Sequence, residues 1–375
     1  MTDDPKRLRR AMVAALLERG DLTPAWQPAF EDVARHRFIP DVVWQHDQDT
    51  PGADLLPLRR ADDPGGWLAA AYADDAVITQ VDDGKPDERG RGWLPTSSAS
   101  APTMVARMLA ALDIEPGMRV LEIGSGTGWN AALLAHRVGA ENVTTLEVDP
   151  AIADHARAAL DAAGYDKVCL VATDGVPGWP AGAPYDRLIA TVGAAVTPYH
   201  WVQQVTPGGR LVVPLANTYE PPGVAVLDRH EDGTATGSLG ACAVFMSLRS
   251  QRVPRRSVRV GEPDTIGTTE LHPYRWAQNR DAAVAIGQRV NGVSKSYREA
   301  TPTTGTVWLL DVVTDSWASV DITEEPPYPV NQSGQRRLFD EVADAYRWWQ
   351  QAGEPAVTDW TVTVGPHGQR MTLPD

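Results

Sequence analysis

The chain has 375 residues, of which 43% are hydrophobic and 22% charged, and its formal net charge is -15. This length favours two domains over one, and the composition is typical of a folded protein with a sizeable core. The surplus of negative charge argues against nucleic acid as the main partner, since phosphate binding requires a cationic surface.

The N-terminal part predicts two helices before Pro40. Apolar residues recur at helical spacing over residues 5 to 19, and a second helix holds Phe30 and Val33. Residues 45 to 98 are rich in turn signals, so we expect irregular structure there apart from one strand at Ala76–Thr79.

From Ser100 onward, strands alternate with helices. Helices are predicted at residues 104–112, 129–138 and 152–163, and strands at 119–123, 143–148, 168–172, 185–191 and 209–215. This alternation indicates an α/β fold with a Rossmann-like parallel sheet and right-handed crossovers.

After residue 220 the alternation stops. Strands are predicted at 305–313 and 317–322, a helix at 337–351, and a hairpin with strands at 360–364 and 370–373. We therefore expect three parts: N-terminal helices and a substrate-side segment (1–98), a cofactor-binding core (99–220), and a C-terminal α+β extension for peptide recognition (221–375). The tryptophans of this extension are interpreted as core more readily than as a peptide groove; they are Trp308, Trp317, Trp348, Trp349 and Trp360.

Neither cysteine has metal-ligand or disulfide spacing. Cys169 and Cys242 stand among apolar residues, so we expect both to be small buried side chains. No metal site is predicted. The N-terminus lacks an apolar signal segment and no stretch is long enough to span a bilayer, so a cytoplasmic protein without a membrane partner is expected.

One cluster of positive charge departs from the acidic average. It consists of Arg252, Arg255, Arg256 and Arg259. A solvated loop or strand is the favoured interpretation, and a patch for an acidic peptide is the alternative.

A glycine loop follows the predicted strand at 119–123 and precedes a helix. Its residues are Gly124, Ser125, Gly126, Thr127 and Gly128. Such a loop lets backbone N–H groups approach a ligand at a helix N-terminus. Because position 129 is Trp, the dinucleotide pattern G-x-G-x-x-G fails, whereas Glu122 completes the methyltransferase pattern E-x-G-x-G-x-G. The loop therefore predicts a site for S-adenosyl-L-methionine.

Two more carboxylates follow successive strands at the same predicted sheet edge. Glu147 ends the next strand, where a carboxylate can accept from both ribose hydroxyls. Asp149 is interpreted as a helix N-cap ahead of Pro150. Asp174, followed by Gly175, is placed to accept from the adenine amino group; an Asp-Gly turn is the alternative.

Over about residues 5 to 215 the sequence resembles the protein-L-isoaspartate (D-aspartate) O-methyltransferase family. The matching stretches are residues 35–40 (RHRFIP), 120–128, 173–175 (TDG), 183–186 (APYD) and 207–214 (PGGRLVVP). The resemblance implies a class I methyltransferase fold that binds S-adenosyl-L-methionine and methylates a carboxylate. His36, between two arginines, is interpreted as a loop contact rather than a catalytic group.

The resemblance also places the site of methyl transfer. The family has a G-Q-T-I-S segment whose serine lies at that site, and the matching segment is Thr96–Ser100. Ser100 takes the place of the active-site serine and Ser98 that of the threonine, but the Gly and Gln are absent. We expect both serines to orient the substrate; the alternative is that they only cap the helix that begins near Pro102.

The extension beyond residue 220 resembles, in length and general character, methyltransferases that accompany ATP-grasp ligases in ribosomal peptide (graspetide) maturation. Those relatives methylate an L-aspartate of a modified precursor peptide, and the ester then cyclises to an aspartimide. This is the main hypothesis, with an already macrocyclised precursor as partner. Repair of isoaspartyl or D-aspartyl residues is the alternative, and a non-catalytic peptide-binding scaffold is a third. Trp276, Tyr274 and Arg275 are candidates to face such a partner.

Overall fold

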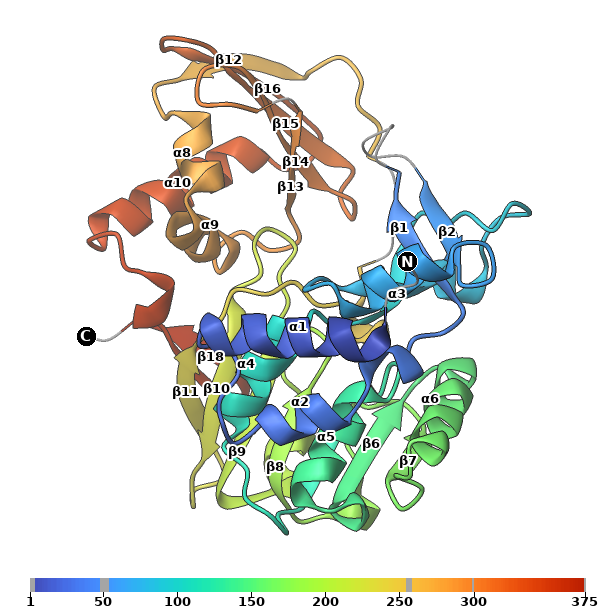
Figure 1. The fold of residues 1–375 in the computed structure, drawn as a ribbon. Helices are drawn as coiled ribbons and strands as arrows, with labels where there is room; N and C mark the ends of the chain where they lie inside the picture. Colours follow the sequence, from blue (N-terminus) through green and yellow to red (C-terminus); the bar gives the residue numbers. More distant parts are fainter. Residues whose placement is uncertain (1–3, 48–53, 254–257, 299, 374–375) are drawn as a thin grey trace.

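The computed structural model describes residues 4–47, 54–253, 258–298 and 300–373. Within them the chain forms a four-stranded sheet (β2-β1-β3-β4), a nine-stranded sheet (β18-β17-β11-β10-β9-β8-β5-β6-β7) and a five-stranded sheet (β12-β16-β15-β14-β13) (Figure 1). The strands are β1 Val42–His46, β2 Leu55–Arg59, β3 Val77–Val81, β4 Pro95–Ala99, β5 Val120–Ile123, β6 Val143–Glu147, β7 Cys169–Ala172, β8 Tyr185–Ala190, β9 Val205–Leu215, β10 Gly223–Arg229, β11 Ala235–Leu239, β12 Thr265–Thr269, β13 Ser294–Arg298, β14 Gly305–Asp311, β15 Ser316–Ile322, β16 Tyr328–Ser333, β17 Thr361–Gly365 and β18 Gly368–Thr372.

Most helices begin where the sequence provides a capping side chain or a proline. Asp4, Asp63, Asp149 and Asn279 each accept a backbone N–H at the first turn of a helix, which satisfies a donor that has no partner inside the helix. The helices are α1 Pro5–Glu18, α2 Gln27–Asp32, α3 Pro64–Tyr72, α4 Pro102–Leu112, α5 Trp129–Val138, α6 Pro150–Ala162, α7 Tyr199–Gln204, α8 Pro273–Gln278, α9 Arg280–Gly287 and α10 Leu338–Gln351.

The central part of the nine-stranded sheet confirms the predicted Rossmann-like parallel sheet. Strands β9, β8, β5, β6 and β7 are parallel neighbours, and helices connect them. The strands predicted between residues 119 and 215 all form, with small differences at their ends. Parallel strands of this kind place the loops at their carboxyl ends along one sheet edge, where ligands bind in such folds.

The same sheet continues beyond residue 220. Strand β10 pairs antiparallel with β9, β11 with β10, and the C-terminal hairpin of β17 and β18 pairs with β11. Figure 1 shows the last strands beside β10 and β11. The boundary expected at residue 220 therefore falls between two neighbouring strands of one sheet. The predicted hairpin forms, but it extends the cofactor-side sheet instead of a separate domain.

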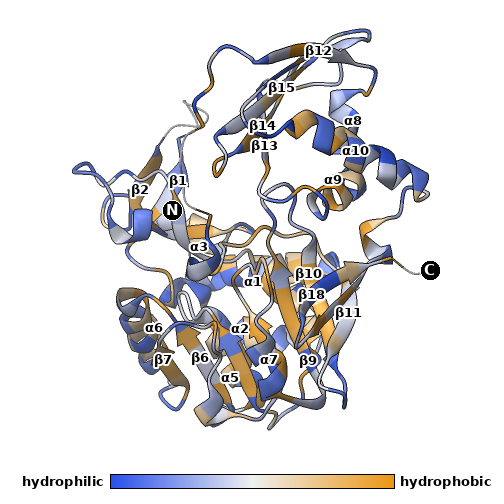
Figure 2. Ribbon diagram, turned by 180° about the vertical axis from the view of Figure 1, so that it is seen from behind, coloured by the Kyte–Doolittle hydropathy of each residue, from blue (hydrophilic) through white to orange (hydrophobic). Residues whose placement is uncertain are grey.

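One apolar core joins the central sheet to the C-terminal region. Leu188 and Val213 of the central sheet belong to the same buried cluster as Val307 and Val320 of the five-stranded sheet. Figure 2 shows the hydrophobic colour concentrated on the central strands. Because burying apolar surface is the dominant favourable term in folding, this shared core ties the C-terminal region to the rest of the fold.

The segment expected to be irregular, residues 45 to 98, is largely ordered. It contributes β2, α3, β3 and β4, which with β1 make the antiparallel four-stranded sheet. The prediction was wrong because each strand is only five residues long and β1 pairs with a strand more than 30 residues away. Such pairing leaves no signal in local turn statistics.

In the C-terminal region, helices α8 and α10 pack on the five-stranded sheet, and α9 packs on α10. Trp317, Trp349 and Trp360 are buried, which confirms the core interpretation for them, while Trp308 and Trp348 are half-buried. Trp276 is fully buried, which removes it from the three candidates to face a partner, whereas Arg275 is exposed and Tyr274 is half-buried.

Both cysteines are exposed, which corrects the expectation that they are buried. Cys169 lies in β7, an edge strand of the nine-stranded sheet, which has a neighbouring strand on one side only.

Of the arginine cluster, Arg255 and Arg256 lie outside the described residues. No helix among the described residues is long and apolar enough to cross a membrane.

Candidate functional site

A cavity of about 500 Å³ opens at the carboxyl ends of the parallel strands. The glycine loop and Glu147 form one wall, and the segment Thr96–Ser100 forms the facing wall. The structure thus brings together almost every residue that the sequence singled out. Of the predicted site residues, those that line the cavity are Ser98, Ser100, Glu122, Gly124, Ser125, Gly126, Thr127, Glu147, Asp174 and Gly175.

The glycine loop needs glycine for conformation and for space. Gly124 and Gly126 have φ of 94° and 52°, a left-handed region that side chains rarely tolerate. A Cβ at Gly124 would lie 2.8 Å from Thr191 Oγ1. Gly128 does not line the cavity: it is the N-cap of α5, packed against α6. Its role is to let the loop turn into the helix, not to contact a ligand.

Glu122 is fully buried at the base of the cavity. Its carboxylate accepts hydrogen bonds from Asn130 Nδ2 at 2.7 Å and from Thr145 Oγ1 at 2.5 Å. Burial raises the pKa of Glu122 to about 7, although these two bonds lower it. Thr145 also shares a hydrogen bond with the Ser125 hydroxyl at 2.7 Å, so Glu122 is linked to the glycine loop through Thr145.

Glu147 is buried at the carboxyl end of β6. One oxygen accepts from Gly126 N–H and the other from Asp149 N–H, both at 3.0 Å. Burial raises the pKa of Glu147 above its ordinary value. Each carboxylate oxygen has two acceptor positions, so both keep capacity for a ligand hydroxyl.

Asp149 caps α6, as the sequence predicts: its Oδ1 accepts from Ala151 N–H and Ile152 N–H. Its other oxygen has partners that the sequence did not reveal. Oδ2 accepts from Gln80 Nε2 at 3.0 Å and from Arg249 Nη2 at 3.2 Å. Burial raises the pKa of Asp149, but these hydrogen bonds outweigh it and lower the pKa below its ordinary value.

Asp174 is exposed and lines the cavity beyond β7. Its Oδ1 accepts from Val176 N–H at 3.0 Å, so the predicted Asp-Gly turn is present together with a carboxylate at the cavity. Gly175 contacts the floor of the site, where a Cβ would lie 2.6 Å from Ile123. The Asp-Gly pair therefore forms a turn and also places a carboxylate at the cavity.

Ser98 and Ser100 line the cavity, and neither hydroxyl has a hydrogen-bond partner among the described residues. Ser98 lies in β4 and Ser100 just after it. The alternative that they only cap α4 was wrong, because its N-cap is Ala101 and the side chain that accepts a backbone N–H of its first turn is that of Asp74, which binds Thr103 N–H at 2.9 Å. A Cβ at Gly126 would lie 3.6 Å from the Ser98 carbonyl, so the two walls face each other closely.

Arg35 carries the structural meaning of the N-terminal motif. The side chain is completely buried and donates to five backbone carbonyls, those of Ala71, Ala73, Asp75, Ala99 and Ser100. Its guanidinium also lies over the ring of Trp129. Burial lowers the pKa of Arg35 to about 10, so it remains charged at neutral pH. Through its bonds to the carbonyls of Ala99 and Ser100, Arg35 fixes the end of the substrate-side wall from the side away from the cavity.

His36, in contrast, does not reach the cavity. Its Nδ1 lies 2.6 Å from the hydroxyl of Tyr72. Burial lowers the pKa of His36, and the positive charges of nearby arginines lower it further. The interpretation as a local contact is confirmed. Among the described residues, no group of three or more His, Cys, Asp and Glu is arranged to hold a metal ion.

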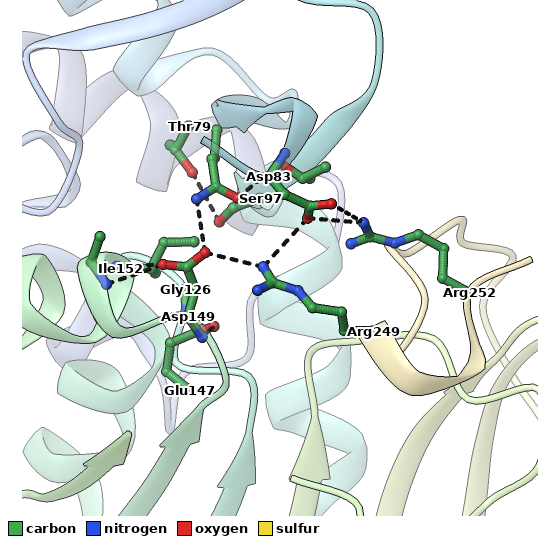
Figure 3. Close-up of polar contacts among 12 residues, drawn as sticks. Thr79, Asp83, Ser97, Gly126, Glu147, Asp149, Ile152, Arg249 and Arg252 are labelled. Carbon is green, nitrogen blue, oxygen red and sulfur yellow. Dashed lines mark hydrogen bonds and ion pairs between the residues drawn. The ribbon is translucent and has the colours of Figure 1, made fainter. Parts of the chain in front are cut away.

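Sequence reasoning missed a segment that closes the cavity. Residues 241–252, here called the strap, connect β11 toward β12, and most of them line the cavity. Leu248 N–H donates to the carbonyl of Gly193, whose N–H donates to the Met246 carbonyl. Arg249 and Arg252 project from the strap toward the facing wall (Figure 3). The only sequence signal was the arginine cluster, interpreted as solvated.

The parallel sheet, the glycine loop and the carboxylate at the end of the next strand define the class I S-adenosylmethionine-dependent methyltransferase fold. Residues 69–252 match the family described as Protein-L-isoaspartate(D-aspartate) O-methyltransferase (PCMT). A relative from Archaeoglobus fulgidus, Protein-L-isoaspartate O-methyltransferase 2, is 36% identical over 153 residues, which are 40% of this chain and 69% of the relative. The chain belongs to the protein-L-isoaspartate O-methyltransferase family.

Other similarities show how much of the chain the family pattern covers. Protein-L-isoaspartate O-methyltransferase from Pyrococcus horikoshii is 41% identical over 135 residues, so the match spans 36% of this chain and 61% of that relative. A solved structure titled protein-L-isoaspartate O-methyltransferase matches with a TM-score of 0.56 and 18% identity, covering 98% of this chain and 100% of that one. The fold of that structure thus includes a counterpart of the C-terminal region.

Proposed function

We propose that this protein transfers a methyl group from S-adenosyl-L-methionine to a peptide carboxylate, and that an L-isoaspartyl or D-aspartyl residue is the favoured substrate. The observation that carries the proposal is the cavity itself. Cofactor-type residues, Gly126 and Glu147, form one wall, and two free serine hydroxyls, Ser98 and Ser100, line the opposite wall.

The residues present fit the cofactor. The glycine loop lines the cavity, Glu147 retains acceptor positions for the ribose hydroxyls, and Asp174 offers an exposed carboxylate for the adenine amino group. The cavity volume of about 500 Å³ lies within the range of small-molecule sites. When bound, S-adenosyl-L-methionine supplies an electrophilic methyl group.

The side chains of this protein have little chemistry to perform beyond orientation. A peptide carboxylate is ionised at neutral pH, because its ordinary pKa is about 3.9, so no general base is needed to make the nucleophile. We assign to Ser100 a hydrogen bond that aims the carboxylate, with Ser98 in support. Holding two reactants in the correct geometry can supply roughly 7–11 kcal/mol of the barrier.

Two findings favour the isoaspartyl substrate. The relatives named above carry the name of that activity, and a protein with that title shares the fold over nearly the whole chain. The sequence suggested a different branch because the C-terminal region is long. Since a protein with this title shares the fold over that length, the length does not argue against repair of isoaspartyl residues.

A second candidate follows from the departure at Thr96–Ser100, which lacks the Gly and Gln of the family segment. This difference, on the wall that meets the substrate, supports methylation of an L-aspartate in a ribosomally made, modified precursor peptide. In that case the next backbone nitrogen would attack the methyl ester, methanol would leave, and an aspartimide would form.

The test compares matched peptides that differ only in isoaspartyl or normal aspartyl linkage, incubated with the protein and cofactor labelled in the methyl group. Methyl gain on the isoaspartyl peptide alone supports the favoured substrate. Methyl gain on a normal aspartyl residue of a macrocyclised precursor, followed by methanol loss in the mass spectrum, supports the second candidate. Label transfer to neither peptide contradicts both, and cofactor binding without transfer is the result expected of a non-catalytic scaffold.

A further inference from the structure

Four charged side chains, Asp83, Asp149, Arg249 and Arg252, form a cluster beside the cavity, here called the clasp, and the two arginines line the cavity. Arg252 Nη1 donates to both carboxylate oxygens of Asp83, at 2.9 and 3.0 Å. Arg249 Nη2 donates to Asp149 Oδ2 at 3.2 Å and lies 3.5 Å from Asp83 Oδ1. Figure 3 shows the two arginines of the strap reaching across to Asp83 and Asp149.

Three residues of the clasp, Asp83, Asp149 and Arg249, belong to a closed ring of polar contacts. Asp83 N–H donates to Thr96 Oγ1 at 3.1 Å, and the Thr96 hydroxyl donates to Gln80 Oε1 at 2.8 Å. Gln80 Nε2 then donates to Asp149 Oδ2 at 3.0 Å. Arg249 contacts both Asp149 and Asp83, which closes the ring. Because every member has partners on both sides, displacing one alters the contacts of the others.

The ring joins three parts of the chain that are distant in sequence. Thr96 begins the substrate-side wall that carries Ser98 and Ser100. Asp149 lies two residues after Glu147 on the cofactor-side wall, and Arg249 lies on the strap. The strap is itself fixed to the central sheet by Gln251, whose amide group binds the backbone of Ala195 and Val196.

Asp83 has a backbone conformation that is unfavourable for residues other than glycine. Asp82, Asp83 and Gly84 have φ of 50°, 52° and 79°, so two residues other than glycine adopt the left-handed region in succession. Such conformations cost about 1–3 kcal/mol each and persist where surrounding contacts enforce them. Asp82 supplies one such contact, because its carboxylate accepts the backbone N–H groups of Trp93 and Leu94.

We propose that Arg249 and Asp83 are positioning residues that lock the substrate-side wall onto the cofactor-side wall and hold the bound cofactor beneath the strap. This inference rests on the proposed function for the identity of the ligand. Asp149 is buried, whereas the ion pair between Arg249 and Asp83 is partly exposed, with side chains that are 34% and 44% accessible. Ion pairs of this kind are individually weak and screened by salt, so the clasp can open to admit and release the cofactor.

The test uses the full chain with two variants. Arg249→Met keeps most of the aliphatic part of the side chain but removes its ion pairs with Asp83 and Asp149. Asp83→Gly removes the carboxylate and places glycine at a left-handed backbone position. The matched control is Arg347→Met, which removes an exposed arginine paired with Asp344 on α10. The dissociation rate of S-adenosyl-L-homocysteine is measured by displacement at low and high sodium chloride, and hydrogen exchange is followed in the free protein over residues 82–99.

We expect both variants to release S-adenosyl-L-homocysteine about five- to tenfold faster than the native protein and to show a weaker salt dependence of release, since each variant keeps one ion pair of the clasp. Exchange over residues 82–99 should be faster in Arg249→Met, with no change in the control. A native-like release rate and unchanged exchange in both variants would overturn the inference. If the native protein binds no S-adenosyl-L-homocysteine, the proposed function fails, whereas the exchange measurement still decides whether the clasp holds the wall.

Discussion

The guanidinium of Arg35 donates a hydrogen bond of 2.9 Å to the backbone carbonyl of Ser100. This contact joins the N-terminal motif, which never reaches the cavity, to the residue predicted to aim the substrate. Because Arg35 also binds the Ala99 carbonyl, the end of the substrate-side wall is fixed by a single buried cation. The motif thus fixes the position of the backbone that carries Ser100.

Replacing this cation tests how much stability it contributes. Arg35→Met leaves several buried carbonyls without donors, and each unsatisfied group costs about 1–3 kcal/mol. We expect the free energy of unfolding to fall by at least about 3 kcal/mol, measured by urea denaturation. Arg37→Met, two residues away and exposed, is the control and should change little. A similar loss in both variants would contradict the special role of Arg35.

Removing the serine hydroxyls separates catalysis from folding. Ser100→Ala should lower kcat by about tenfold, the value of one orienting hydrogen bond of about 1–1.5 kcal/mol, and Ser98→Ala should have a smaller effect. Melting temperatures should stay native, since neither hydroxyl has a partner among the described residues. Ser238→Ala, at an exposed position of β11, is the control. Native kcat in Ser100→Ala would rule out the assigned role.

Glu147→Gln tests the ribose contact. The amide nitrogen cannot accept from Gly126 N–H or Asp149 N–H, so one of these donors loses its partner and the charged acceptor is lost. We expect S-adenosyl-L-homocysteine to bind about 10- to 100-fold more weakly, since hydrogen bonds to charged groups contribute about 1.5–3 kcal/mol. Calorimetric titration measures this, with exposed Asp166→Asn as the control. Unchanged affinity would place the ribose elsewhere.

Glu122 predicts a pH dependence of stability in the absence of cofactor. Its folded-state pKa is raised from 4.5 to about 7 by burial, so the folded protein binds this proton more tightly than the unfolded chain does. The contribution of Glu122 is therefore fully present below pH 4.5 and is lost as the pH rises to about 7, a change of roughly 3 kcal/mol.

Glu122→Gln should abolish that dependence, because the amide can still accept from Asn130 and donate to Thr145. Urea denaturation from pH 4 to 8 measures the difference. Parallel pH profiles for the native protein and the variant would show that Glu122 does not titrate in this range.

The continuous sheet predicts that the region after residue 220 is needed for folding. A chain that ends at residue 220 loses β10 and β11, which exposes the long edge of β9 and the apolar side chains packed on it. We expect this fragment to be insoluble, and co-expression of residues 221–375 to restore soluble protein. A monomeric fragment 1–220 with a cooperative unfolding transition would show that the extension folds separately.

The sequence by itself determined the parallel part of the fold and the cofactor-side wall. Glu122, the glycine loop, Glu147 and Asp174 are close along the chain to the strands that carry them, and hydrophobic periodicity with turn chemistry locates such strands. Asp149 as a helix cap was also predictable, since a cap is a contact between residues two or three apart.

Only the tertiary structure decided what lies opposite that wall. The contacts of Arg35 with Ser100 and of Arg249 with Asp149 join residues 65 and 100 positions apart, and the four-stranded sheet and the C-terminal hairpin likewise depend on distant strand pairs. Such contacts form because burial and charge pairing reward them after the chain has folded, and no local pattern encodes them. The sequence therefore predicts where the cofactor binds, whereas the tertiary structure determines how the site is closed.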